Sequence, residues 1–163
     1  MKVSEDVSWR RIFQQAEGLL SVSTNPVANA ANLSALLYQE LPEVSWVGFY
    51  FSDSGSLVLG PFQGKPACVS IAMGKGVCGT AAASGQSTRV ADVDAFDGHI
   101  ACDADARAEL VVPLFKHGEL LGVLDIDSTQ PDRFSEQDEK GLERLAQVYL
   151  SSIECESVFL YKL

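Results

Sequence analysis

Two apolar runs joined by a short polar stretch constrain the fold of this chain more than any other feature. Leu110–Phe115 and Leu120–Asp127 are rich in Val, Leu and Ile, and His117-Gly118 lies between them. Such runs on either side of a glycine-containing turn predict an antiparallel hairpin. Asp125 and Asp127 are two residues apart in the second run, so both point to the same face of the strand. Carboxylates in an apolar strand are costly to bury unless something uses them, so the hairpin also predicts a site.

The rest of the chain places this hairpin in an α+β fold. We expect helices over residues 8–20, 25–40 and 77–83 and from Ser135 toward the C-terminus, and further strands over 46–51, 56–59, 68–71 and 88–90. Asn25-Pro26 is a cap followed by a proline at the first helical position, and Ser135 with Asp138 resembles a capping box. Helices at both ends bracket mainly antiparallel strands, which is the α+β pattern. Without repeats or linkers, residues 1–163 are expected to form one domain.

Composition excludes several classes of function. The chain has 12 Lys and Arg against 22 Asp and Glu, a net charge of −10, which argues against nucleic acid as a partner. No run has the length of a membrane span, and no basic segment followed by an apolar core opens the chain, so we expect a cytoplasmic protein with no membrane partner. The four cysteines form no C-x-x-C pair, so neither a metal nor another cofactor is predicted.

Cys102 is the candidate nucleophile. It lies in the glycine-bounded loop that leads into the first strand of the hairpin. An unperturbed thiol is only about 3% thiolate at pH 7, so a nucleophilic thiol needs local help. His99, Arg107 or backbone N–H groups are the candidates for that help, whereas Asp103 and Asp105 would oppose it if they faced the sulfur. We expect Cys102 to be reactive rather than a small buried hydrophobe.

Cys68 and Cys78 lie on either side of Gly74-Lys75-Gly76. Both can be packing residues, or one of them can form a disulfide with Cys102. Sequence spacing does not give the Cα separation that a disulfide needs, so the sequence leaves both pairings open. Cys155, in the last predicted helix, is assigned no role.

Glu109, Asp125 and Asp127 are the candidate carboxylate group. Crowded carboxylates raise one another's pKa, so one of them can stay protonated near neutrality and act as an acid. A solvated strand edge is the alternative. A two-residue turn would pair residue 109 with 126 and put Glu109 on the opposite face from Asp125. A bulge at Pro113 would restore a shared face.

Trp46 and Tyr50 are four residues apart in a predicted strand, so they share a face. Core packing is the commoner use of such aromatic residues. Their functional use would be as a wall for a small apolar group.

These motifs resemble one known family. The stretch Gly98-His99-Ile100-Ala101-Cys102-Asp103-Ala104 with Glu109, the run Gly122-Val123-Leu124-Asp125-Ile126-Asp127-Ser128, Trp46-Val47-Gly48-Phe49-Tyr50 and the spacing of the first three cysteines are similar to those of the free methionine-(R)-sulfoxide reductases. The resemblance covers nearly the whole chain. It implies a GAF-like fold, with a central antiparallel sheet and the N- and C-terminal helices packed on one side, often in a homodimer.

The resemblance also implies an activity and roles for residues. The reaction is the reduction of free L-methionine (R)-sulfoxide, with thioredoxin as reductant. Cys102 would be the nucleophile and Cys68 the resolving thiol, while the role of Cys78 stays open. Glu109, Asp125 and Asp127 would hold the sulfoxide oxygen and the substrate ammonium group, and Trp46 and Tyr50 would line the methyl pocket. The rival interpretation is a GAF-type sensor that binds a small ligand without chemistry, and a weaker one is a thiol-based peroxide sensor.

Overall fold

Six strands form one antiparallel sheet in the part of the chain that the computed structural model describes, residues 7–100 and 102–154. The strand order is β3-β2-β1-β6-β5-β4, and each neighbouring pair is antiparallel. The strands are β1 Trp46–Asp53, β2 Ser56–Gln63, β3 Ser70–Ala72, β4 Thr88–Val90, β5 Ala108–Lys116 and β6 Glu119–Ser128. The predicted hairpin is therefore β5–β6, and β6 is central because it lies between β5 and β1.

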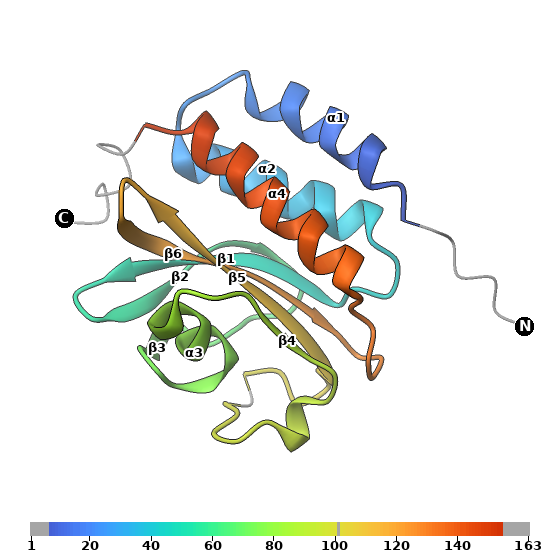
Figure 1. The fold of residues 1–163 in the computed structure, drawn as a ribbon, viewed down its shortest axis with the longest axis vertical. Helices are drawn as coiled ribbons and strands as arrows, with labels where there is room; N and C mark the ends of the chain where they lie inside the picture. The colour runs from blue at the N-terminus through green and yellow to red at the C-terminus, as the bar shows by residue number, and fades with distance from the viewer. Residues whose placement is uncertain (1–6, 101, 155–163) are drawn as a thin grey trace, which may run out of the picture.

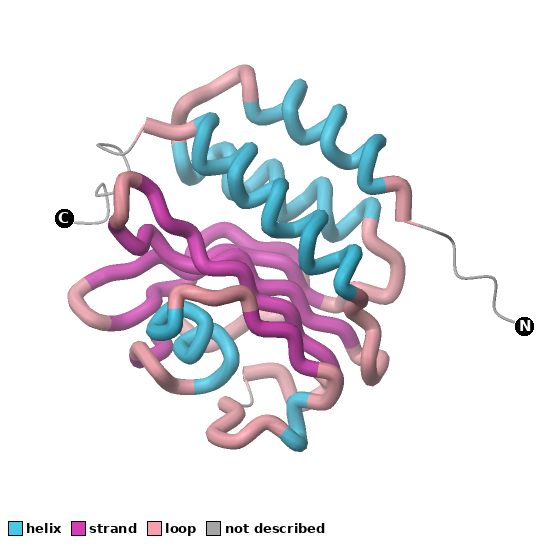
Figure 2. The backbone as a smooth tube through the Cα atoms, viewed as in Figure 1, coloured by secondary structure: helices cyan, strands magenta, loops and turns pink. Residues whose placement is uncertain are grey.

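Three helices cover one face of the sheet and one short helix lies on the other (Figure 1). The first three are α1 Trp9–Leu20, α2 Pro26–Glu40 and α4 Glu136–Ser152, and the fourth is α3 Gly76–Ser84. Figure 2 shows the loops between β4 and β5 on the α3 side, interrupted by the 3₁₀ turn Val93–Ala95. The α+β class, the antiparallel sheet and the packing of the terminal helices on one side are confirmed. In the described residues, no helix has the length and apolar character needed to cross a membrane.

The sheet separates two apolar clusters because side chains alternate along its strands. On β1, Val47, Phe49 and Phe51 join the larger cluster, which includes residues of α1, α2 and α4. Trp46 and Tyr50 point the other way, into a smaller cluster with residues of α3 such as Val77. The helical layer thus holds most of the buried apolar surface, and the α3 side is left to form a pocket.

The helix termini follow the predicted capping. Asn25 Oδ1 accepts from the backbone N–H groups of Val27 and Ala28. Ser135 and Asp138 form a reciprocal capping box at the start of α4. These bonds satisfy N–H groups that have no partner inside the helix.

Two predicted strand boundaries were wrong. β2 extends past residue 59 to Gln63, because its end pairs with Val47 of β1 across a register shift. β3 begins at Ser70 rather than at Cys68, since it pairs with β2 only through Ser70, Ile71 and Ala72. Cys68 therefore lies in the loop before β3.

The β5–β6 pair contains a bulge, but not the one predicted at Pro113. Pro113 pairs with Val123 in normal register, and the shift lies between Leu114 and Phe115. Leu114 is opposite Gly122 and Phe115 is opposite Leu120, so Leu121 of β6 is the extra residue. Every pair from Leu114 toward Ala108 is displaced by one residue as a result.

Candidate active site

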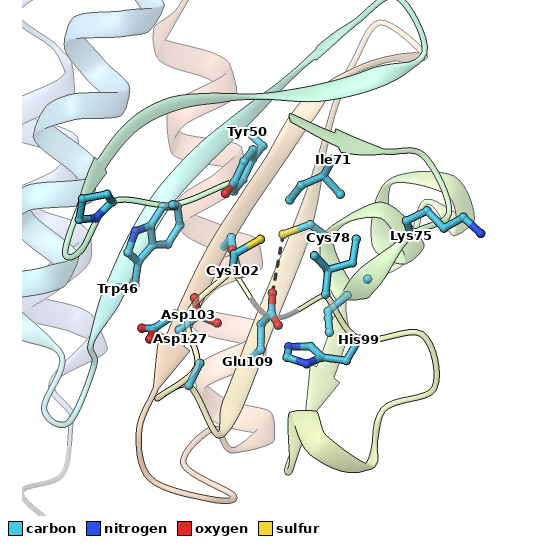
Figure 3. A pocket seen from close by; sticks show the side chains of 17 residues that line it. Trp46, Tyr50, Ile71, Lys75, Cys78, His99, Cys102, Asp103, Glu109 and Asp127 are labelled. Atoms are coloured by element: carbon cyan, nitrogen blue, oxygen red, sulfur yellow. Dashed lines mark hydrogen bonds between the residues drawn. The ribbon is translucent and has the colours of Figure 1, made fainter. Parts of the chain in front are cut away.

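A pocket opens on the α3 side of the sheet, next to the ends of β5, β6 and β1 (Figure 3). Seven of the eight predicted site residues line it: Trp46, Tyr50, Cys78, Cys102, Glu109, Asp125 and Asp127. The eighth, Cys68, is joined to Cys102 by a disulfide with a Cα–Cα distance of 5.3 Å. This bond ties the loop before β3 to the loop before β5, which are 34 residues apart in the chain.

The bulge at Leu121 brings the three carboxylates to one face. Glu109 lies directly opposite Asp127, and Val111 lies opposite Asp125. On the other side of β6, Asp125 is opposite Gly48 and Asp127 is opposite Trp46. Glu109 and Asp125 are buried, and Asp127 is partly buried.

Burial and mutual repulsion make these carboxyl groups retain protons. Burial, then the neighbouring charges of Asp125 and Asp127, hold the pKa of Glu109 well above its ordinary value. Burial and the charges of Asp125 and Asp103 likewise raise the pKa of Asp127. For Asp125 burial raises the pKa to about 6, opposed by hydrogen bonds with Glu109 and Cys78. The cluster can therefore hold a proton near neutrality, as an acid catalyst requires.

Cys78 is buried and faces the carboxylates. Its Sγ donates to Glu109 Oε1 over 3.7 Å. Burial, followed by the charges of Asp125 and Glu109, raises the pKa of its thiol well above the usual value. Helix α3 is tightly seated, because a Cβ on Gly79 would lie 2.5 Å from the carbonyl oxygen of Ala72. Cys78 is thus a fixed, protonated thiol near pH 7, and it is the free cysteine of the described residues.

The aromatic wall is held by the loop that carries Cys68. Trp46 stacks on Tyr50 and Phe62, with ring centroids 5.9 and 5.3 Å apart. The indole Nε1 of Trp46 donates to the carbonyl of Lys65, and Tyr50 Oη donates to that of Cys68, each at 3.1 Å.

Gly48 leaves the space that the Trp46 ring fills. A Cβ at this position would lie 2.6 Å from the indole ring. Gly48 lies between Trp46 and Tyr50 on the same face of β1, and its lack of a side chain makes room for the indole ring.

Of the residues expected to assist or oppose a Cys102 thiolate, one of each kind lines the pocket: the candidate helper His99 and the opposing carboxylate Asp103. Arg107 instead makes ion pairs with Asp92 and Asp94 at 3.6 and 3.7 Å and does not line the pocket. Asp105 pairs with Lys65 at 2.7 Å on the surface.

Sequence reasoning assigned no site role to Lys75, which also lines the pocket. The glycines on either side of it, in Gly74-Lys75-Gly76, were the available signal, because they mark a loop that turns sharply into α3.

Comparisons with known proteins agree with this geometry. The family model described as GAF domain matches residues 31–154. Free methionine-R-sulfoxide reductase of Escherichia coli (strain K12) is 54% identical over 127 residues, which is 78% of this chain and 77% of that protein. The chain belongs to the free methionine-R-sulfoxide reductases, a GAF-domain family.

Solved structures of this reductase family have the same fold. The reduced form of fRMsr of Staphylococcus aureus has a TM-score of 0.90 at 43% identity, covering 94% of this chain and 100% of that one. Free methionine-R-sulfoxide reductase from Neisseria meningitidis in complex with its substrate has a TM-score of 0.87 at 43% identity, covering 92% and 89%. The predicted family is confirmed.

Proposed function

We propose that this chain reduces free L-methionine (R)-sulfoxide to methionine, with Cys102 as nucleophile and Cys68 as resolving thiol. The observation that carries this proposal is the Cys68–Cys102 disulfide, because its Cys102 half lines one pocket with Glu109, Asp125 and Asp127. A redox pair beside carboxyl groups with raised pKa values supports a reaction that needs a thiol and an acid together. Membership of the reductase family supports the same reaction.

The proposed chemistry has four balanced steps. In the first step the Cys102 thiol attacks the sulfoxide sulfur and forms an S–S bond, while a carboxylic acid protonates the oxygen, so that the S–O bond breaks and water leaves. Water then attacks Cys102 Sγ and returns the proton, the S–S bond breaks, and methionine and a sulfenic acid on Cys102 result. The Cys68 thiol then displaces the sulfenic hydroxyl, forming the disulfide and releasing water. An external dithiol finally reduces the disulfide and is itself oxidised.

Roles for the pocket residues follow from their positions. Glu109 is the proposed acid, because its pKa is raised by burial and by both neighbouring carboxylates. Asp125 and Asp127 would bind the substrate ammonium group, and the rings of Trp46 and Tyr50 would enclose the methyl group. A free amino acid would be favoured over a peptide-bound residue because only the free amino acid has an α-ammonium group for these two carboxylates to bind.

Three further assignments belong to this proposal. Thioredoxin is the proposed reductant, since a protein disulfide needs a dithiol partner. A homodimer and a cytoplasmic location are proposed from the family resemblance.

The test is NADPH consumption in the presence of thioredoxin and thioredoxin reductase, with separated methionine sulfoxide epimers. We expect turnover of the free R epimer and little or none with the S epimer or a peptide-bound sulfoxide. Equal rates on the peptide would contradict the proposed substrate. A non-catalytic sensor would instead bind the sulfoxide and leave NADPH unconsumed.

A further inference from the structure

We propose that Cys78, Glu109 and Asp125 bind a thiophilic divalent cation of the Zn²⁺ type. The ligand atoms that these residues offer all lie within 4.8 Å of one another, and all three residues are buried. They come from α3, β5 and β6, and Figure 3 shows Cys78 joined to Glu109 by a dashed line within the pocket. This site shares Glu109 and Asp125 with the proposed reductase site. A cation bound there would remove the catalytic proton and occupy the ammonium position, so it would inhibit the reduction.

The distances suit a tetrahedral ion. Zinc bonds thiolate sulfur at about 2.3 Å and carboxylate oxygen at about 2.0–2.2 Å, which puts the two ligand atoms roughly 3.5 Å apart. Cys78 Sγ and Glu109 Oε1 are 3.7 Å apart. Since the Asp125 oxygen is within 4.8 Å of both, a small side-chain rotation would bring it into bonding distance.

An unsatisfied oxygen points to a cation. Asp125 is only 5% exposed, and among the described residues its Oδ1 has no hydrogen-bond donor outside the cluster that it forms with Cys78 and Glu109. A buried carboxylate oxygen without a donor is costly, and a bound cation removes that cost. A substrate ammonium group would also satisfy Oδ1. The adjacent thiol is what favours a metal, because thiolate is a preferred ligand of zinc and of similar ions.

The charge balance also favours a divalent cation. No Lys or Arg in the described part of the chain forms an ion pair with Glu109 or Asp125. The other titratable groups facing the pocket are Tyr50, Lys75, His99, Asp103 and Asp127. On binding, the cation would displace the thiol proton of Cys78 and the proton retained by the carboxyl groups, and both would go to solvent.

The experiment uses the oxidised protein, in which the Cys68–Cys102 disulfide keeps two sulfurs from binding metal. Cys155, outside the described residues, is removed by Cys155→Ser in every variant. Cd²⁺ is the probe, followed by thiolate-to-metal charge-transfer absorption and by calorimetry in two buffers of different ionisation enthalpy. We expect one equivalent bound, with the absorption band and proton release.

Matched variants locate the site. Cys78→Ala should abolish the charge-transfer band, and Asp125→Asn should weaken binding by about tenfold or more. Glu119→Gln, which changes an exposed carboxylate of β6, should leave both signals unchanged. If Cys78→Ala does not fold, Cys78→Ser keeps the side-chain size and should still lose the band.

Two results would overturn the proposal. One is the absence of a band in the parent protein, and the other is a band that persists in a folded Cys78 variant. Neither readout requires methionine sulfoxide reduction, so failure of the reductase assay and failure of this proposal are separately recognisable.

Discussion

Glu109 of β5 and Asp127 of β6 are cross-strand partners, and the extra residue Leu121 is what makes them so. Without that residue Glu109 would face Ile126, whose side chain lies in the helical layer on the opposite side of the sheet. A backbone irregularity near the β5–β6 turn thus decides whether three carboxyl groups meet at the other end of the strands.

We expect Gly122→Ala to destabilise the protein and disturb this register. A Cβ at Gly122 would lie 2.0 Å from the carbonyl oxygen of Tyr50, and the residue has a φ of +154°. Overpacking of this kind costs about 1–3 kcal/mol, measured as the free energy of unfolding in urea. Gly18→Ala is the matched control, because a Cβ there has no neighbour within 4 Å. That change is expected to be neutral or stabilising, by up to about 1 kcal/mol. Equal losses in both variants would contradict the role given to Gly122.

Glu109→Gln is expected to lower kcat/KM by about 10²–10⁴, the usual contribution of a general acid. In the wild type, kcat/KM should fall as pH rises through the raised pKa of Glu109, since the acid is then deprotonated. The variant should lose that descending limb. A pH profile with the limb intact would move the acid role to another carboxyl group.

Asp125→Asn is expected to stabilise the protein at neutral pH. In the folded protein the pKa is about 6, against an ordinary value of 3.8, so the folded state binds more protons between these two values. Stability contributed by this group is therefore greatest below pH 3.8 and is lost as pH rises to about 6. At 1.36 kcal/mol per pKa unit, the loss is about 3 kcal/mol. The midpoint of thermal unfolding should exceed that of the wild type at pH 7 but not at pH 4. Glu17→Gln, on the exposed face of α1, should show no such difference.

Cys102→Ser is expected to abolish methionine formation, whereas Cys68→Ser should form about one methionine per enzyme and then stop. The first variant lacks the proposed nucleophile, and the second keeps it but cannot resolve the sulfenic acid, which dimedone should trap. Quantifying methionine in a single turnover without reductant distinguishes them. Peptide mapping of the oxidised wild type should give the Cys68–Cys102 linkage. A dominant Cys78–Cys102 linkage would transfer the resolving role to Cys78.

Local signals made much of the fold predictable. Apolar periodicity, the Asn25-Pro26 cap and the Ser135 capping box placed the helices closely, and period-two alternation put Asp125 and Asp127 on one face. The position of the bulge was not found, although Gly122 inside an apolar strand was a usable signal, because isolated strand glycines mark bulges or close backbone contacts. The predicted bulge at Pro113 was wrong, since this residue pairs with Val123 in normal register.

The contact between Cys78 and Glu109 could not be predicted in this way. Their side chains meet only after α3 has docked on the sheet, where Gly79 contacts Ala72 across the β3–α3 connection. Spacing along the sequence carries no information on that docking. The absence of a C-x-x-C pair bears only on zinc sites of that kind, and it carries no information on side chains that three separate elements bring together.

Because the sheet lies between the two apolar clusters, its two faces are under different evolutionary constraints. Along β1, Val47, Phe49 and Phe51 serve the helical layer, while Trp46, Gly48 and Tyr50 shape the pocket. Successive residues of β1 are therefore constrained differently, one by packing in the hydrophobic core and the next by the shape of the pocket. A combinatorial library restricted to the pocket-facing positions could change ligand preference while the hydrophobic layer that stabilises the domain stays untouched.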